Sequence, residues 1–131
     1  MSLLRPGTAN VRPLHRQRVL VATTDRRFLR VAGFLLAREG YDVDSSRRPS
    51  ELLDDIDRQL PNVVVLDGSD SLAAAVRTVA AIEALHPRVR VLIVVEDDAR
   101  PVSKMLRVFP KWSAMNDLLR EVERPYPGVA G

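Results

Sequence analysis

The chain has no cysteine, few aromatic residues and no long apolar run. Without cysteine, neither disulfides nor thiolate metal sites can contribute to the fold. Cysteine usage therefore does not indicate whether the protein works in an oxidising or a reducing compartment. No apolar run approaches the roughly 20 residues of a membrane-spanning helix. The N-terminus also lacks the hydrophobic segment of a secretory signal. We therefore expect a cytoplasmic protein that does not enter a membrane.

Length and composition favour one globular domain. The 131 residues are 46% hydrophobic and 28% charged, which is ordinary for a soluble domain. The first 18 residues hold four arginines and no acid, whereas the rest of the chain has 16 basic and 17 acidic residues. We interpret residues 1–17 as a disordered basic leader, residues 18–124 as the domain and residues 125–131 as a Pro/Gly tail. A basic leader can contact nucleic acid or an acidic partner, but a solvated segment is the simpler explanation.

From Arg18 onward, short buried-strand runs alternate with amphipathic segments typical of helices. The expected strands are 19–22, 41–44, 63–66, 91–95 and 105–109, and the expected helices are 26–39, 49–60, 72–85 and 115–122. This alternation predicts an α/β fold with a five-stranded parallel sheet, doubly wound and flavodoxin-like, in the strand order 2-1-3-4-5. Only residues 96–104 separate the last two strands and Pro101 interrupts them, so we expect the fourth helix to be shortened or missing.

Asp67 is the most informative residue because it closes the apolar run Val63–Leu66. An unbroken apolar run of this length is typical of a strand buried on both faces of a parallel sheet. Ligands of open α/β sheets bind in the crevice outside the carboxyl ends of the strands. The Asp67 carboxylate is therefore expected at the functional edge of the sheet.

The spacing of these segments resembles the response-regulator receiver domain, over about residues 18–123. The resemblance is carried by the segment 28–43, the run Pro61–Asp67, the pair His86-Pro87 before the fourth strand and Phe109-Pro110-Lys111. It implies a domain of two-component signal transduction or a phosphorelay. It further implies that Asp67 stands at the phosphoacceptor position and that Lys111 stands where a lysine contacts the phosphoryl group.

The chain departs from the family at positions that matter for phosphorylation. The resemblance implies an acidic pair for Mg²⁺ after the first strand, but Thr23 and Thr24 stand there, and two hydroxyls are poor replacements for carboxylates. Val95 stands at the switch position, where the family has Thr or Ser. We therefore expect no cofactor, with Asp25 and Asp70 as weak candidates should Mg²⁺ bind.

Simpler explanations exist for several of these residues. Thr23 and Thr24 are expected to cap the first helix, although Asp25 can do so instead. Lys111 can form a structural ion pair with Asp67. Trp112 is a candidate interface anchor, but packing in the core is the commoner role of tryptophan. We interpret the two histidines, His15 and His86, as structural.

Other classes of function fit less well. The turn after the first strand has no glycine, so the dinucleotide-binding and P-loop motifs are absent from the sequence. No serine sits in a nucleophile elbow, and no histidine and carboxylate accompany a nucleophile. We expect that the protein is not an enzyme. The expected core also lacks a basic patch with interleaved aromatics, so we do not expect it to bind nucleic acid.

The leading hypothesis is an atypical receiver-like signalling domain that regulates through protein–protein contact, with Mg²⁺-dependent phosphorylation of Asp67 lost. The expected partner is a kinase, an output domain or another regulator, and a homodimer near the fifth strand and last helix is a further option. Two alternatives stay open. One is a working phosphoacceptor that uses Asp67, and the other is a module that binds a small anion through Arg26, Arg27 and Lys111.

Overall fold

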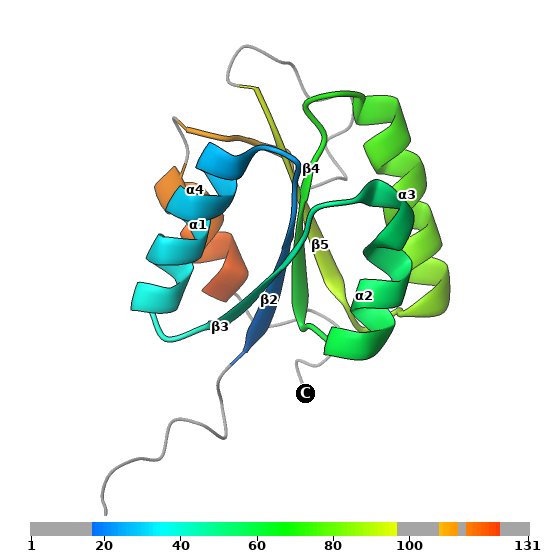
Figure 1. The fold of residues 1–131 in the computed structure, drawn as a ribbon, viewed down its shortest axis with the longest axis horizontal. Helices are drawn as coiled ribbons and strands as arrows, with labels where there is room; N and C mark the ends of the chain where they lie inside the picture. The colour runs from blue at the N-terminus through cyan, green and yellow to red at the C-terminus, as the bar shows by residue number, and fades with distance from the viewer. Residues whose placement is uncertain (1–16, 97–107, 113–114, 124–131) are drawn as a thin grey trace, which may run out of the picture.

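The computed structural model describes residues 17–96, 108–112 and 115–123. These residues form a parallel five-stranded sheet in the order β3-β2-β4-β5-β6 (Figure 1). The strands are β2 (Arg18–Ala22), β3 (Asp42–Ser46), β4 (Val63–Asp67), β5 (Arg90–Val95) and β6 (Val108–Pro110). Counted along the chain, this is the order 2-1-3-4-5 that the sequence predicts, so the fold prediction is confirmed.

Helices cover both faces of the sheet, as expected for right-handed parallel crossovers. Helices α1 (Arg26–Arg38) and α4 (Met115–Glu123) pack on one face. Helices α2 (Leu52–Gln59), entered through a 3₁₀ turn at Pro49–Glu51, and α3 (Leu72–Leu85) pack on the other (Figure 1). Among the described residues, no helix is long and apolar enough to cross a membrane.

Strands β2 and β4 are buried on both sides because their residues alternate between two cores. Val19 and Val21 face the core that contains Phe28 of α1. Leu20 and Ala22 face the core on the side of α2 and α3. A strand points successive side chains to opposite faces, so a strand covered on both faces needs an unbroken apolar run.

Leucines at the ends of the predicted helices 49–60 and 72–85 do not face the core. Leu60, the last residue of the first of these, lies after α2 and caps its C-terminus with φ 53°, and it is 66% exposed. A left-handed residue turns the chain out of the helix, which takes the side chain off the buried face. Leu85, at the last position of α3, is also exposed, while Ile82 one turn earlier is fully buried.

Some predicted segments lie partly or wholly outside the described residues. These are most of the leader, the tail, and the segment 97–104 where a shortened fourth helix was expected. The fifth strand was expected at 105–109, and its described part is β6 at Val108–Pro110. The second strand runs from Asp42 to Ser46, slightly later than predicted.

The turn after β4 lies very close to its neighbours, which positions Asp67. A Cβ added to Gly68 would lie 3.1 Å from both Ala75 Cβ and Ile93 Cγ2. The Gly68 amide donates a 2.7 Å hydrogen bond to the Val94 carbonyl. Glycine therefore allows the chain to leave β4 between β5 and the start of α3, with Asp67 held at the sheet edge.

Candidate functional site

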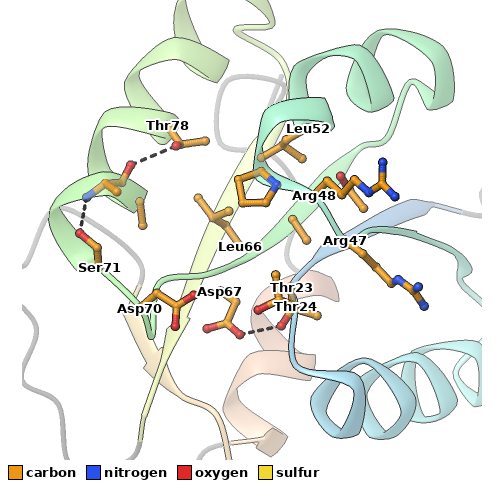
Figure 2. Close-up of a pocket in the computed structure, with 15 residues that line it drawn as sticks. Thr23, Thr24, Arg47, Arg48, Leu52, Leu66, Asp67, Asp70, Ser71 and Thr78 are labelled. Atoms are coloured by element: carbon orange, nitrogen blue, oxygen red, sulfur yellow. Dashed lines mark hydrogen bonds between the residues drawn. The ribbon is translucent and has the colours of Figure 1, made fainter.

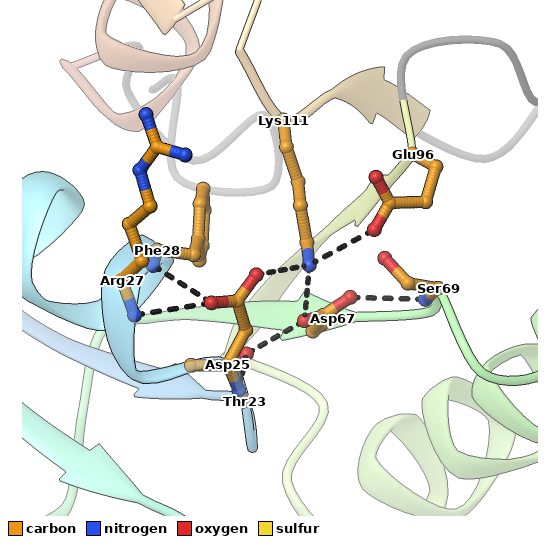
Figure 3. Close-up of polar contacts among 8 residues, drawn as sticks. All are labelled: Thr23, Asp25, Arg27, Phe28, Asp67, Ser69, Glu96 and Lys111. Atoms are coloured by element: carbon orange, nitrogen blue, oxygen red, sulfur yellow. Dashed lines mark hydrogen bonds and ion pairs between the residues drawn. The ribbon is translucent and has the colours of Figure 1, made fainter.

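Lys111 lies at the centre of a cluster of charged side chains at the carboxyl edge of the sheet. Its side chain is only 2% exposed, although it is a lysine. Its Nζ atom lies 2.9 Å from Asp67 Oδ2, 3.0 Å from Asp25 Oδ2 and 3.6 Å from Glu96 Oε2 (Figure 3). A buried ammonium is tolerated only when it is paired and hydrogen-bonded, and this cluster meets that requirement.

The backbone and the core hold Lys111 in this position. Lys111 directly follows β6. Its amide donates a 2.8 Å hydrogen bond to the Val95 carbonyl, which holds the residue beside the end of β5. The Nζ atom lies 5.5 Å from the centre of the Phe28 ring, within the range of a cation–π contact. The side chain therefore runs along the core before it reaches the carboxylates.

Both carboxylate oxygens of Asp67 have protein donors. Oδ2 accepts a 2.6 Å hydrogen bond from the Thr23 hydroxyl in addition to the Lys111 contact. Oδ1 accepts a 2.9 Å hydrogen bond from the Ser69 amide. The Asp67 side chain is 9% exposed. The residue that the resemblance places at the phosphoacceptor position is thus partly buried and bonded to three neighbours.

Asp25 caps α1, so the expectation that Thr23 and Thr24 cap it is wrong. Asp25 Oδ1 accepts hydrogen bonds from the amides of Arg27 at 3.0 Å and Phe28 at 3.1 Å. The Thr23 hydroxyl instead accepts from the Asp25 amide and donates to Asp67. Thr24 is exposed. Helix geometry explains the difference, because only the residue directly before the first turn can reach the free amides of that turn.

The contacts shift the pKa values so that all three charges persist near neutral pH. Burial raises the pKa of Asp67, but hydrogen bonds from Ser69, Thr23 and Lys111 outweigh it and lower the pKa below its ordinary value. The hydrogen bond from Lys111 is the main cause that lowers the pKa of Asp25. Burial lowers the pKa of Lys111, but Asp67 and Asp25 more than compensate and raise it.

These residues do not fit Mg²⁺. Mg²⁺ needs near-octahedral oxygen ligands that usually include carboxylates. Thr23 and Thr24 follow β2, and both oxygens of Asp67 already accept hydrogen bonds, one of them alongside an ammonium. Among the described residues, no group of three or more acidic or histidine side chains can hold a metal. The positive charge at this site is supplied by Lys111.

The end of β5 offers no hydroxyl to a phosphoryl group. Val95 is 2% exposed and belongs to the core beside α2 and α3. The next residue, Glu96, is 56% exposed and brings a third carboxylate toward Lys111. A negative charge added to Asp67 would face Glu96 as well as Asp25.

A small cavity of about 150 Å³ opens beside Asp67, on the side of α2 and α3 (Figure 2). Its walls include Thr23, Thr24, Asp70 and apolar side chains such as Leu52 and Leu66. The side chains of Arg47 and Arg48 line its rim and extend away from it in Figure 2. The carboxylates of Asp67 and Asp70 and the outward-pointing arginines make this cavity a poor site for an anion. Lys111 cannot bind an anion there because it is paired with Asp67 and Asp25.

The remaining predicted residues have structural surroundings. Trp112 is partly buried against the core and meets Phe28 edge to face, with ring centres 5.7 Å apart. The Arg27 guanidinium lies 5.1 Å from the Trp112 ring. His86 ends α3, with Nε2 2.7 Å from Asp57 Oδ1. His15 lies outside the described residues.

Solved structures of response regulators share this fold. A CheY-like response regulator receiver domain protein from Methanospirillum hungatei JF-1 is 19% identical to the chain, with a TM-score of 0.65, covering 82% of this chain and 91% of that one. A response regulator from Thermotoga maritima is 16% identical, with a TM-score of 0.68, covering 82% and 95%. NtrX from Brucella abortus, in complex with ADP, is 17% identical, with a TM-score of 0.72, covering 83% of this chain and 26% of that one.

These likenesses, at low identity, define the fold as that of a CheY-like response-regulator receiver domain. No protein-family model and no curated protein matches the chain. Fold alone does not decide function, so the role of the domain has to be argued from the site.

Proposed function

We propose that this protein is a receiver-like signalling domain that regulates through protein–protein contact without Mg²⁺-dependent phosphorylation of Asp67. The observation that supports it best is the Lys111 ammonium, which lies between Asp67 and Asp25 at 2.9 and 3.0 Å. In this proposal the lysine provides permanently the positive charge that a metal ion would otherwise bring.

The rest of the site supports the same proposal. Thr23 offers Asp67 a hydroxyl instead of a metal-binding carboxylate. Val95 has no group that can bond a new phosphoryl oxygen, and Glu96 would repel it. A domain with this site keeps one charge state and one conformation, so its partner recognises a constant surface. We expect no catalytic turnover, and we expect the partner to be a kinase, an output domain or another regulator.

The first test is an amide NMR titration with Mg²⁺ and then with Mg²⁺ plus beryllofluoride, which mimics an aspartyl phosphate. We expect no saturable shifts of the Gly68, Ser69 and Lys111 amides. The matched control is the double variant Thr23→Asp/Thr24→Asp, which restores two carboxylates after β2 and should respond to Mg²⁺. Saturable shifts in the unmodified protein would contradict the proposal and favour a working phosphoacceptor.

A second test addresses the partner. Proximity labelling in the native host should recover the same proteins with the unmodified chain and with Asp67→Ala. The purified variant should also keep the circular dichroism spectrum of the unmodified protein. Loss of the labelled proteins from a variant that is still folded would mean that partner binding depends on the Asp67 carboxylate, which the proposal excludes.

A further inference from the structure

Helix α1 presents an unneutralised basic stripe that includes an exposed aromatic ring. Arg26, Arg30, Phe34 and Arg38 recur every four residues and are all exposed, with Phe34 at 63%. Residues four apart share one face of a helix. No acid lies within α1, and among the described residues none of these three arginines forms an ion pair with a carboxylate. The Arg38 guanidinium lies 5.9 Å from the Phe34 ring.

Helix α2 presents the complementary pattern. Asp54 and Asp57 are exposed and lie three residues apart, and Leu60, which is 66% exposed, follows after another three. Within residues 48–59 the other charged side chains form two pairs, Arg48–Glu51 and Arg58–Asp55. Asp57 contacts His86, which carries a positive charge only when it is protonated. The exposed stripe of α2 is therefore acidic and ends in an apolar side chain.

The two stripes match in the order of their groups and are similar in spacing. From N- to C-terminus, the α1 stripe has two cations followed by an aromatic ring, namely Arg26, Arg30 and Phe34. The α2 stripe has two anions followed by an aliphatic side chain, namely Asp54, Asp57 and Leu60. With a rise of 1.5 Å per residue, neighbouring α1 groups are about 6 Å apart, and Asp54 and Asp57 of α2 are about 4.5 Å apart, with Leu60 directly after the helix. With Phe34 against Leu60 and the helices parallel, Arg30 falls opposite Asp57 and Arg26 opposite Asp54. The reach of an arginine side chain covers the small difference in spacing.

One molecule cannot make this contact with itself. Helix α1 covers one face of the sheet and α2 covers the other (Figure 1). We propose that the α1 stripe of one copy of this chain docks on the α2 stripe of a second copy. Such a contact joins two different surfaces, so it is head-to-tail and produces rings or open chains instead of a two-fold dimer.

The contact is small and strongly charged, which determines its properties. A 13-residue helix on an 8-residue helix buries less than a standard protein interface. We expect association with a dissociation constant on the order of 10⁻⁴ M, weakened by salt because the ion pairs are exposed. This inference does not depend on the state of Asp67, since neither stripe includes a residue of the Lys111 cluster.

Sedimentation velocity of the full chain over a concentration series, at low and high salt, tests the proposal. The α1-reversed variant, Arg26→Glu/Arg30→Glu, and the α2-reversed variant, Asp54→Lys/Asp57→Lys, should each lose self-association by about tenfold or more. A one-to-one mixture of the two should regain it, because each basic stripe again meets an acidic one. The variant that carries all four substitutions should associate with itself.

The matched control is Arg77→Glu/Arg88→Glu, which makes the same change in net charge at two exposed arginines outside both stripes. It should associate as the unmodified protein does. Phe34→Ser should weaken association, whereas a purely electrostatic attraction would not require the ring. Circular dichroism and melting temperature establish that each variant is folded. The proposal is overturned by an unmodified protein that stays monomeric up to about 1 mM, by failure of the mixture to regain association, or by equal loss in the control.

Discussion

Lys111 and Asp25 are 86 positions apart in the chain, yet Nζ of the first donates a 3.0 Å hydrogen bond to Oδ2 of the second. The same Asp25 side chain caps α1 through its other oxygen. The ion pair therefore joins the segment after β6 to the start of α1, and Asp67 joins both to the centre of the sheet. The cluster is thus a structural tie as well as the candidate site.

Removing the lysine charge should destabilise the protein strongly. Lys111→Met leaves Asp67 and Asp25 beside an apolar side chain, and loss of one partner of a buried pair costs about 3–5 kcal/mol. Urea unfolding gives the free energy of unfolding. Arg120→Met, which breaks the exposed Arg120–Asp117 pair, is the control and should cost at most about 1 kcal/mol. Adding Asp67→Asn to Lys111→Met should recover part of the lost free energy of unfolding. Equal costs for Lys111→Met and Arg120→Met would show that burial of the ion pair does not matter.

The same cluster predicts how stability depends on pH. The pKa values of Asp25 and Asp67 lie below 3.8 in the folded protein, so their contribution is complete above that pH and is lost as the pH falls through the folded values. The pKa of Lys111 lies above 10.5, so its contribution is complete below that pH and is lost as the pH rises through the folded value. The stability difference between the unmodified protein and Lys111→Met should therefore shrink at both extremes. A stability difference between the unmodified protein and Lys111→Met that stays constant below pH 3.8 would contradict the lowered pKa of Asp67.

The two roles of Asp25 can be separated by substitution. Asp25→Ala removes both the helix cap and the ion pair, whereas Asp25→Ser keeps a capping oxygen and loses only the charge. We expect Asp25→Ala to be less stable than Asp25→Ser by about 1 kcal/mol. Thr24→Ala, at an exposed neighbouring position, should change stability by no more than about 0.5 kcal/mol. Thermal and urea denaturation of the three variants measure these differences. A larger loss of stability for Thr24→Ala would mean that Thr24 caps α1 after all.

Two glycines should respond in opposite directions to substitution by alanine. Gly33 lies inside α1, where an added Cβ meets only Val43 Cγ1 at 3.9 Å, so Gly33→Ala should stabilise the protein by up to about 1 kcal/mol. Gly40 has φ +98°, which strains any residue with a side chain, so Gly40→Ala should cost about 1 kcal/mol or more. Melting temperatures of the pair test this prediction. Stabilisation by Gly40→Ala would mean that the chain changes conformation after α1.

Much of the fold can be predicted from the order of residues because it depends on neighbours along the chain. The apolar run that ends at Asp67 requires a strand covered on both faces, and its carboxyl end defines the edge where the site lies. The threonines after β2 and the valine at the end of β5 can likewise be recognised from the sequence. Leu60 could not be, because a left-handed cap at that position depends on how α2 ends against the following turn.

The chemistry of the site was decided by the tertiary structure. The strand pattern of the sequence placed Asp67 at the edge of the sheet, and the resemblance to receiver domains implied that Lys111 reaches the same edge and that Thr23 and Thr24 replace an acidic pair there. Only the folded structure placed Asp25 on the lysine and Thr23 on Asp67. Periodicity records which side of an element is buried. Contacts across 44 to 86 positions depend instead on strand register and side-chain direction, which short-range patterns do not contain.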